Sequence, residues 1–423
     1  MSTINLLEYP NIAYGDVNGA FPPAGQYATI DSTGLLRRDP LGCNKLFYGK
    51  NHENRWVVAS RIARALECGV NIDNLASCPP GHSLRLNENG FEYLGGEEIT
   101  AIEPDDAFDP EKFRSTVRTK LDAAMDKVRR QFCEMSAAVC LSGGLDSSCV
   151  AAMAKGRFKD LSAYSFSYVT ATDLAAFKAG ADPSSLASAS SDFQSAIAVA
   201  NSLEIPFEAV LRLHEDAVSS AQRAINLCQD WRDFNVHCAV VNLFLAEHLA
   251  AAFPLNDVIV LTGDLMNEYV CDYHEEMVDG TIYYPQPRMA LAKRRRFFVR
   301  GLDAGDRELG LFNAYQIPVI QIFAAVARDY LTVPEEILQR SDCKEFLNDH
   351  LLPEYVRQVV STSKRRAQVG GEDGGTLALF HRAGLDQQSL IELWMEQLPG
   401  DIGNAATDII HFGRYRTQPR VKD

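Results

Sequence analysis

The spacing of apolar and polar residues divides the chain into two parts. Up to about residue 110, short apolar stretches such as Lys45–Tyr48, Arg55–Val58 and Phe91–Leu94 are separated by turn residues, for example Pro79–Gly81. Short runs bounded by Gly, Pro and Asn are typical of strands and hairpins. The pattern predicts a small β-rich domain over residues 1–110 and a second domain over residues 111–423.

The second part opens with helical spacing and then alternates strands with helices. Val117, Leu121 and Val128, with charged residues between them, predict a helix over residues 111–133. Short apolar runs predict buried strands, and helical spacing predicts the helices between them: strands Ala137–Leu141, Leu161–Tyr168, Phe207–Val210 and Val258–Leu261, and helices Ser147–Ala154, Phe193–Ser202 and 236–252. This order predicts an α/β fold with a doubly wound parallel sheet, where ligands gather at the carboxyl ends of the strands.

Two other segments differ in composition or in the spacing of their apolar residues. Residues 171–191 are rich in Ala and Ser and contain Gly180 and Pro183, which predicts a mobile loop. Beyond about residue 300 the spacing becomes mostly helical.

Composition and charge narrow the classes of function. The 423 residues are 46% hydrophobic and 23% charged, enough for more than one core. A net charge of −15 opposes nucleic-acid binding. The basic run Lys293–Arg296 is interpreted either as a solvated helix face or as a site wall facing phosphates or an acidic substrate.

Targeting signals and cysteine pairs are also missing. The first residues do not show the pattern of a signal peptide. The sequence contains no run of about 18 apolar residues, so no membrane span is predicted. Ten cysteines are scattered without a CxxC pair, so we expect neither disulfides nor a zinc site. The predicted location is the cytoplasm.

The segment with the clearest chemistry is Ser142-Gly-Gly-Leu-Asp-Ser-Ser148, directly after a buried strand. Two glycines allow a sharp turn, and the helix that follows presents unbonded amide groups to that turn. Amide groups and the helix dipole favour an anion, and small hydroxyls add donors, so the segment predicts a phosphate site. Asp146 cannot bind phosphate itself and is predicted to hold Mg²⁺.

This order resembles the pyrophosphate-binding loop of the ATP pyrophosphatase superfamily, and in particular the asparagine synthetase branch with the β-lactam synthetases and lasso-peptide cyclases. Tyr164–Tyr168 is similar to the family's adenine strand, and Val260–Asp264 to its phosphate-covering loop. The resemblance implies an adenine-nucleotide α-hydrolase-like synthetase domain over residues 111–423. It also implies a reduced Ntn-glutaminase-like domain over residues 1–110.

The same resemblance implies roles for individual residues. Lys364 would act as an electrophilic clamp on the leaving group, in a glycine-rich segment whose alternative interpretation is a solvated basic loop. The remaining implied residues fall into three groups: catalytic Asp264 and Glu268; ATP and pyrophosphate binding by Leu141, Ser142, Gly143, Gly144, Leu145, Asp146, Ser147, Ser148, Ser165, Phe166, Gly263 and Lys344; and Mg²⁺ binding by Asp146 and Asn267.

Several positions depart from the family pattern. Ser2 stands where the glutaminase nucleophile is a cysteine, and the front domain is short, so no glutaminase activity is expected. Asn267 replaces a metal-binding aspartate, so either Asp264, Glu268 or Asp272 supplies the second carboxylate or the metal is held more weakly. Gln316 and Gln321 replace the Arg and the final Asp of the family's ExRxPFLD stretch, which argues against aspartate as the substrate.

The implied activity is an ATP- and Mg²⁺-dependent ligase that adenylates a substrate carboxylate and passes the acyl group to an amine or ammonia. The expected partners are a small-molecule or peptide carboxylate and an amine donor, with no nucleic acid or membrane; a pathway partner protein and a homodimer stay open. The acidic stretch 272–276 is interpreted as an amine-recognition element or as a solvated turn. The alternatives are a lasso-type peptide macrocyclase and a non-catalytic nucleotide-binding member of the family.

Overall fold

The first hundred residues form two five-stranded sheets that share a core. The computed structural model describes residues 2–3, 12–17, 20–21, 25–31, 33–97, 99–286, 288–301, 306–360 and 375–396. One sheet has the order β1 (Ser2–Thr3), β2 (Ile12–Val17), β7 (Trp56–Ala59), β6 (Phe47–Lys50), β8 (Ala76–Ser77); the other has β10 (Phe91–Gly96), β9 (His82–Leu86), β5 (Leu35–Arg38), β4 (Gln26–Ile30), β3 (Ala20–Phe21). Tyr48 and Trp56 of the first sheet pack with Leu36 and Leu84 of the second. The predicted β-rich part is confirmed.

The second part is built on a parallel sheet of five strands. Its order is β13 (Phe207–Leu213), β12 (Leu161–Val169), β11 (Ser136–Cys140), β14 (Val258–Thr262), β17 (Val319–Gln321), and every neighbouring pair is parallel. The four predicted strands are present, within a few residues of their expected ends. β17 was missed because it has only three residues, too few for a recognisable pattern.

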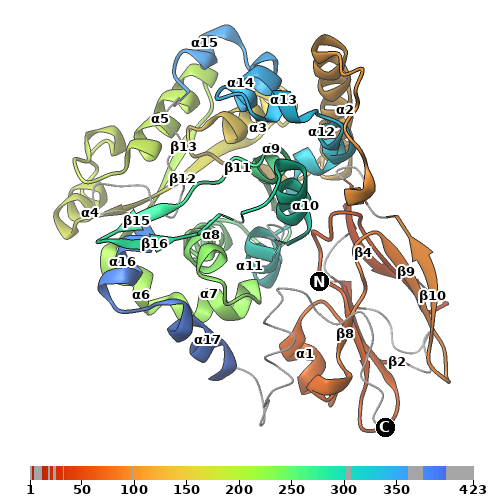
Figure 1. Ribbon diagram of the computed structural model, residues 1–423. Coiled ribbons are helices and arrows are strands. Elements are labelled where there is room, and N and C mark those ends of the chain that lie inside the picture. Colours follow the sequence, from red (N-terminus) through yellow and green to blue (C-terminus); the bar gives the residue numbers. More distant parts are fainter. Residues whose placement is uncertain are drawn as a thin grey trace.

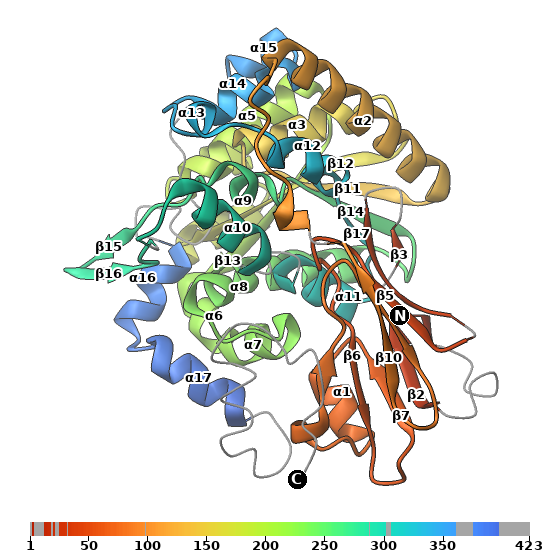
Figure 2. The same ribbon diagram turned by 45° about the vertical axis from the view of Figure 1, so that its right-hand side comes forward.

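Helices cover both faces of this sheet (Figures 1 and 2). On one face lie α2 (Pro110–Gln131), α3 (Leu145–Ala154) and α5 (Ser191–Leu203); on the other lie α6 (His214–Ser219), α7 (Ala221–Cys228), α8 (Asp233–Ala252) and α11 (Leu311–Ala314). α2 begins where the Asp109 carboxylate accepts the amides of Glu111 and Lys112, a typical helix cap. The doubly wound α/β fold class is confirmed.

The prediction of a mobile loop over residues 171–191 is wrong. The segment contains α4 (Ala171–Lys178) and the short 3₁₀ turn η5 (Pro183–Ser185). Its small polar residues act as caps, because Thr170 Oγ1 accepts the amide of Asp173 at 3.2 Å and the Asp173 carboxylate accepts the amide of Ser188 at 2.7 Å. Ser, Thr and Asp favour such local bonds, so a composition typical of loops here stabilises ordered turns.

Beyond residue 300 the described residues are mostly helical, as predicted, with β17 as the one strand there. The further elements are α1 (Ile62–Glu67), η3 (Ile72–Asn74), η4 (Ile99–Ala101), α9 (Met266–Val270), the hairpin β15 (Glu276–Val278) and β16 (Thr281–Tyr283), α10 (Leu291–Gly301), the π-helical turn η6 (Asp306–Gly310), η7 (Ile322–Val326), α12 (Ala327–Leu331), α13 (Glu335–Leu338), α14 (Cys343–Asn348), η8 (Asp349–Leu351), α15 (Glu354–Arg357), α16 (Gly375–Arg382) and α17 (Gln387–Glu396). In the basic run of α10, Arg295 is buried and donates to the carbonyl oxygens of Leu331 and Val333.

The two parts of the molecule meet through buried side chains. Gln26 Nε2 donates to Gln321 Oε1 at 2.9 Å, and the Gln321 amide donates back to Gln26 Oε1 at 2.9 Å. One continuous apolar core includes Phe47 and Val57 of the front part and the strands of the parallel sheet. The division into two domains between residues 110 and 111 stays a prediction.

Among the described residues, α8 is the one helix long and apolar enough to cross a membrane, with a mean hydropathy of 1.2. In the most apolar stretch of 18 residues in this helix, 61% is buried inside the protein. The apolar surface of α8 therefore packs in the core between the sheet and α7, α11 and η6.

Candidate active site

The turn between β11 and α3 has a shape that requires glycine. Gly143 has a φ of +74°, and a Cβ atom at this position would lie 2.5 Å from the Ser195 Cβ atom of α5. L side chains rarely adopt this backbone conformation. Gly144 has an ordinary φ of −77°, and a Cβ atom there would meet little besides the Ser142 hydroxyl.

Hydroxyl groups organise the turn. Ser147 Oγ accepts the amide of Ser142 at 3.1 Å and lies 3.1 Å from Ser142 Oγ, while Ser148 Oγ donates to the Gly144 carbonyl at 2.7 Å. No side chain caps the N-terminus of α3. Its first amides therefore remain available to an anion, as the phosphate prediction requires. We call residues 142–148 the loop end.

Beside this turn, β12 has an open backbone edge. On the β11 side, the described pairing of β12 ends at Tyr164, whose carbonyl accepts the Leu141 amide at 2.9 Å. On the β13 side it continues to Val169. Ser165 and Phe166, both predicted to bind ATP, lie on the unpaired stretch and line the same cavity as the loop end.

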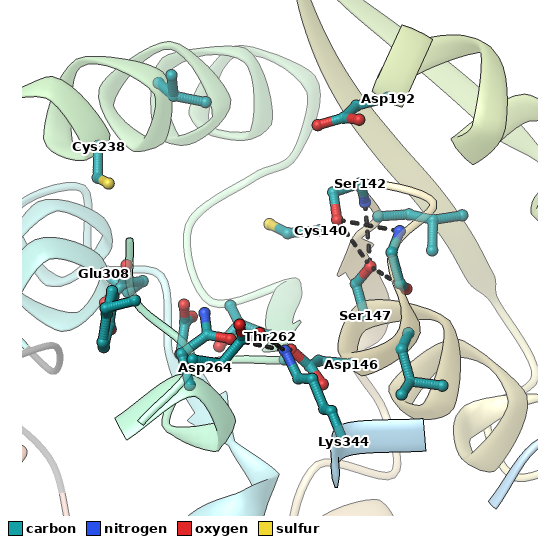
Figure 3. Close-up of a pocket in the computed structure, with 18 of the residues that line it drawn as sticks. Cys140, Ser142, Asp146, Ser147, Asp192, Cys238, Thr262, Asp264, Glu308 and Lys344 are labelled. Carbon is teal, nitrogen blue, oxygen red and sulfur yellow. Dashed lines mark hydrogen bonds and ion pairs between the residues drawn. The ribbon is translucent and has the colours of Figure 1, made fainter. Parts of the chain in front are cut away.

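A cavity of about 580 Å³ lies at the carboxyl ends of the strands. The loop end forms one side of it, and Cys238, Asp264 and Glu308 lie across from that side (Figure 3). Burial raises the pKa of the Cys238 thiol to about 11, so this cysteine is a neutral thiol at neutral pH. The predicted binding residues Ser142, Asp146, Ser147, Gly263 and Lys344 all line the cavity.

The loop after β14 packs against the start of α3. A Cβ atom on Gly263 would lie 2.7 Å from the Ser147 nitrogen, so the glycine permits this close approach. As a result, the Lys344 ammonium contacts both predicted metal ligands. It forms an ion pair with Asp146 and donates to Asn267 Oδ1 at 2.6 Å.

The residues around this ammonium fit a magnesium ion. Asp146 Oδ1 is buried and has no hydrogen-bond partner, and Asp272 Oδ2 lies 3.5 Å from the Lys344 nitrogen. Carboxylate and amide oxygens are ligands that Mg²⁺ uses together with phosphate oxygens. Within the described part of the chain, no group of three His, Cys, Asp or Glu residues could hold a metal by itself.

A second set of charges lies deeper, which we call the buried charge cluster: Asp264, Glu268, Arg307 and Glu308. Arg307 Nε lies 3.3 Å from Glu308 Oε1, and Arg307 Nη2 lies 3.8 Å from Glu268 Oε1. Arg307 and Glu308 lie on the π-helical turn η6, a form that often occurs at functional sites. Burial raises the pKa of the Glu308 carboxyl and, less strongly, that of Asp264.

The structure places the predicted catalytic residues differently. Asp264 lines the cavity, whereas Glu268 is 3% exposed, lies behind the wall and accepts the Tyr273 hydroxyl at 2.6 Å. Lys364 lies outside the described residues. Arg307 and Glu308 were not predicted as site residues, because a neighbouring acid and base in a helical stretch is no signal on its own.

The acidic stretch 272–276 is split between the cavity and the surface. Asp272 lines the cavity, where it faces Lys344. His274 also lines the cavity, with its Nε2 atom 3.4 Å from Asp272 Oδ1, although its side chain is exposed. Glu275 is on the surface and accepts the Gln286 amide at 3.2 Å. The basic run 293–296 does not line the cavity.

Comparison with known proteins agrees with this geometry. Residues 116–300, which include the loop end, β12 and the β14 loop, match the asparagine synthase family. The predicted resemblance to asparagine synthetases is thereby confirmed over these residues. The match supports an ATP-dependent ligase in general terms.

Two solved structures are similar to the chain, each at 14% sequence identity. NMN synthetase from Francisella tularensis aligns with 74% of this chain and 100% of its own, with a TM-score of 0.28. NAD+ synthetase from Burkholderia pseudomallei aligns with 62% of this chain and 90% of its own, with a TM-score of 0.25. At such scores neither adds to the assignment, and no curated protein matches the chain.

Proposed function

We propose that the protein is an ATP-dependent ligase that activates a substrate carboxylate as an acyl-adenylate and joins it to an amine or ammonia. The observation that supports this most is the loop end, a glycine turn with uncapped helix amides at the edge of a parallel sheet. It lies within the stretch that matches the asparagine synthase family. Such a turn suits the pyrophosphate of a bound ATP.

The proposed reaction has two steps. A carboxylate oxygen of the substrate attacks the α-phosphorus of ATP, and the bond from that phosphorus to pyrophosphate breaks. The amine then attacks the acyl carbon, its nitrogen loses a proton, and the carbon–oxygen bond to AMP breaks. The amides of α3 and the Ser142 and Ser147 hydroxyls would hold the leaving pyrophosphate.

Other cavity residues have matching roles. The open edge of β12 at Ser165 and Phe166 would hydrogen-bond a planar base through its backbone. Mg²⁺, held by Asp146 and Asn267, would screen the phosphate charges. Asp264, partly buried in the cavity wall, would take the catalytic role.

The deep part of the cavity disfavours a free dicarboxylate. Arg307 is already paired with Glu308 and Glu268, so its charge is neutralised from within the protein. Gln321, which stands for the family's final Asp, is bonded to Gln26. The carboxylate substrate is therefore proposed to be one other than aspartate, in agreement with the two glutamine replacements.

Exchange of labelled pyrophosphate into ATP tests the proposal. Wild-type protein with Mg²⁺ is assayed against a panel of amino acids, dicarboxylates and peptides. Exchange should depend on one carboxylate class and should fall at least about 100-fold in Asp146→Ala, since that change removes a metal ligand. Asp160→Ala is the matched control, because Asp160 is exposed at the amino end of β12.

Two results decide between the alternatives. Exchange with a leader-processed peptide only would favour the macrocyclase. Absence of ATP binding by calorimetry, together with absence of exchange, would contradict the ligase and favour a non-catalytic role.

A further inference from the structure

The Lys344 ammonium lies where the sequence predicts a magnesium ion. It contacts one oxygen from each of three elements: the first turn of α3, the start of α9 and the segment after α9. These oxygens belong to Asp146, to Asn267 at 2.6 Å and to Asp272 at 3.5 Å. Three oxygens therefore converge on one positive atom, and the third belongs to Asp272.

The backbone fixes Asp272 in this position. Cys271 ends α9 in a left-handed conformation with a φ of +57°, and the Asp272 amide then donates to the Asn267 carbonyl at 3.0 Å. This bond closes the helix end and folds the chain back. It holds the backbone of Asp272 against that of Asn267 across the short helix.

The other two candidate carboxylates are engaged in the buried charge cluster. Glu268 is 3% exposed, accepts the Tyr273 hydroxyl and lies near Arg307. Asp264 lies in the field of the Arg307 guanidinium. Asp272 has a different environment, with one oxygen toward Lys344 and the other toward the exposed His274.

We propose that Asp272 replaces the carboxylate lost at Asn267 and completes a divalent-cation site with Asp146 and Asn267. The Lys344 ammonium holds this site in the nucleotide-free protein and leaves it when the metal enters. The proposal rests on the proposed function, because the displaced ammonium would pair with the phosphates of the bound ATP.

Electrostatics explains why a resident cation is needed. The Asp146 and Asp272 side chains are 15% and 23% exposed, and two carboxylates this close repel each other without a positive charge between them. One ammonium reduces that repulsion, and a divalent ion would do so more fully. The buried, unpartnered Asp146 Oδ1 is an acceptor that Lys344 leaves unused.

The replacement of the Lys344 ammonium by a metal ion can be tested with Mn²⁺ and the full chain without nucleotide. Binding is monitored by the electron paramagnetic resonance signal of free Mn²⁺. Wild type should bind weakly, and Lys344→Met about tenfold or more tightly, since a competing unit charge within about 4 Å is removed. Lys344→Arg keeps the charge and should bind like wild type. Equal affinity in wild type and Lys344→Met would overturn the proposal.

Double variants identify the third ligand. In the Lys344→Met background, Asp272→Asn should cancel the tenfold gain, whereas Asp264→Asn should leave it within about twofold. The reverse pattern would identify Asp264 as the third metal ligand and overturn the assignment of Asp272.

A measurement on wild type avoids dependence on a variant that fails to fold. Limited acetylation with peptide mapping should show Lys344 becoming several-fold more reactive as Mn²⁺ saturates, with the surface residue Lys155 as internal reference. Unchanged reactivity of Lys344 would overturn the exchange. Pyrophosphate exchange is read separately, so a chain that binds Mn²⁺ as described but lacks exchange contradicts the ligase and not the cation site.

Discussion

The loop end and the buried charge cluster lie on opposite sides of one cavity and use their polar groups in opposite ways. At the loop end, the α3 N-terminus has no side-chain cap, and Asp146 Oδ1 has no partner. In the cluster, Arg307 Nε forms an ion pair with Glu308 Oε1 at 3.3 Å, and Tyr273 bonds Glu268. The first side keeps hydrogen-bonding capacity for a ligand, and the second pairs its charges within the protein.

This difference teaches which side acts on the nucleotide and which supports the structure. Buried charges are tolerated when they are paired, and removal of one partner leaves the others uncompensated. Open amides at a helix terminus cost little in contact with solvent and gain most when an anion arrives. We therefore expect changes in the cluster to affect stability first, and changes in the loop end to affect ATP binding first.

Arg307→Met should have the largest effect on stability. The Arg307 and Glu268 side chains are 7% and 4% exposed, so the variant leaves the buried Glu268 without its cationic partner. We expect the free energy of unfolding in urea to fall by about 3–5 kcal/mol. Arg296→Met, which breaks an exposed pair with Glu103, should cost less than about 1 kcal/mol. Equal losses in the two variants would contradict a structural role for the cluster.

Gly143→Ala should reduce ATP affinity by about 100-fold, because a strained backbone conformation costs about 1–3 kcal/mol and the turn must also move away from Ser195. Isothermal titration with ATP measures this. Gly144→Ala is the matched control, since φ there is ordinary and the nearest atom to a new Cβ, Ser142 Oγ, is 3.4 Å away. If both variants bound ATP as wild type does, the loop end would not be the phosphate site.

The two sides also differ in how much the sequence reveals. The loop end is a run of neighbouring residues after an apolar strand, so glycines, hydroxyls and Asp146 could be assigned together. The sheet was also predictable, because each long strand and helix has its own local pattern. β17 and the turns within residues 171–191 depend on a few residues and on capping bonds such as Asp173 to Ser188, which composition does not reveal.

The cluster and the cation site depend on contacts between distant segments. Glu268 and Arg307 are separated by thirty-nine positions, and their contact follows from the packing of η6 beside the β14 loop. Lys344 was predicted to bind ATP or pyrophosphate, and the structure adds its contacts with Asp146 and Asn267. No local pattern specifies such pairs, because they form only when the sheet brings the ends of its strands together.

A change in the pH dependence of stability is the smallest expected effect, and it concerns Glu308. Burial raises the pKa of Glu308 above its ordinary value of 4.5, so above that pH the folded state keeps a proton that the unfolded state releases. The free energy of unfolding should therefore fall as pH rises from 4.5, by at most about 1.4 kcal/mol per pH unit for this group.

Glu308→Gln has no proton to keep, so its free energy of unfolding should fall less steeply over the same range, while Asp264, whose pKa burial also raises, keeps part of the slope. Urea unfolding from pH 4.5 to 8 measures both slopes, with Glu354→Gln on the surface as the control for loss of one carboxylate. Identical slopes in wild type and Glu308→Gln would mean that Arg307 keeps Glu308 ionised throughout. The cluster would then hold a permanent ion pair, and its contrast with the loop end would rest on geometry alone.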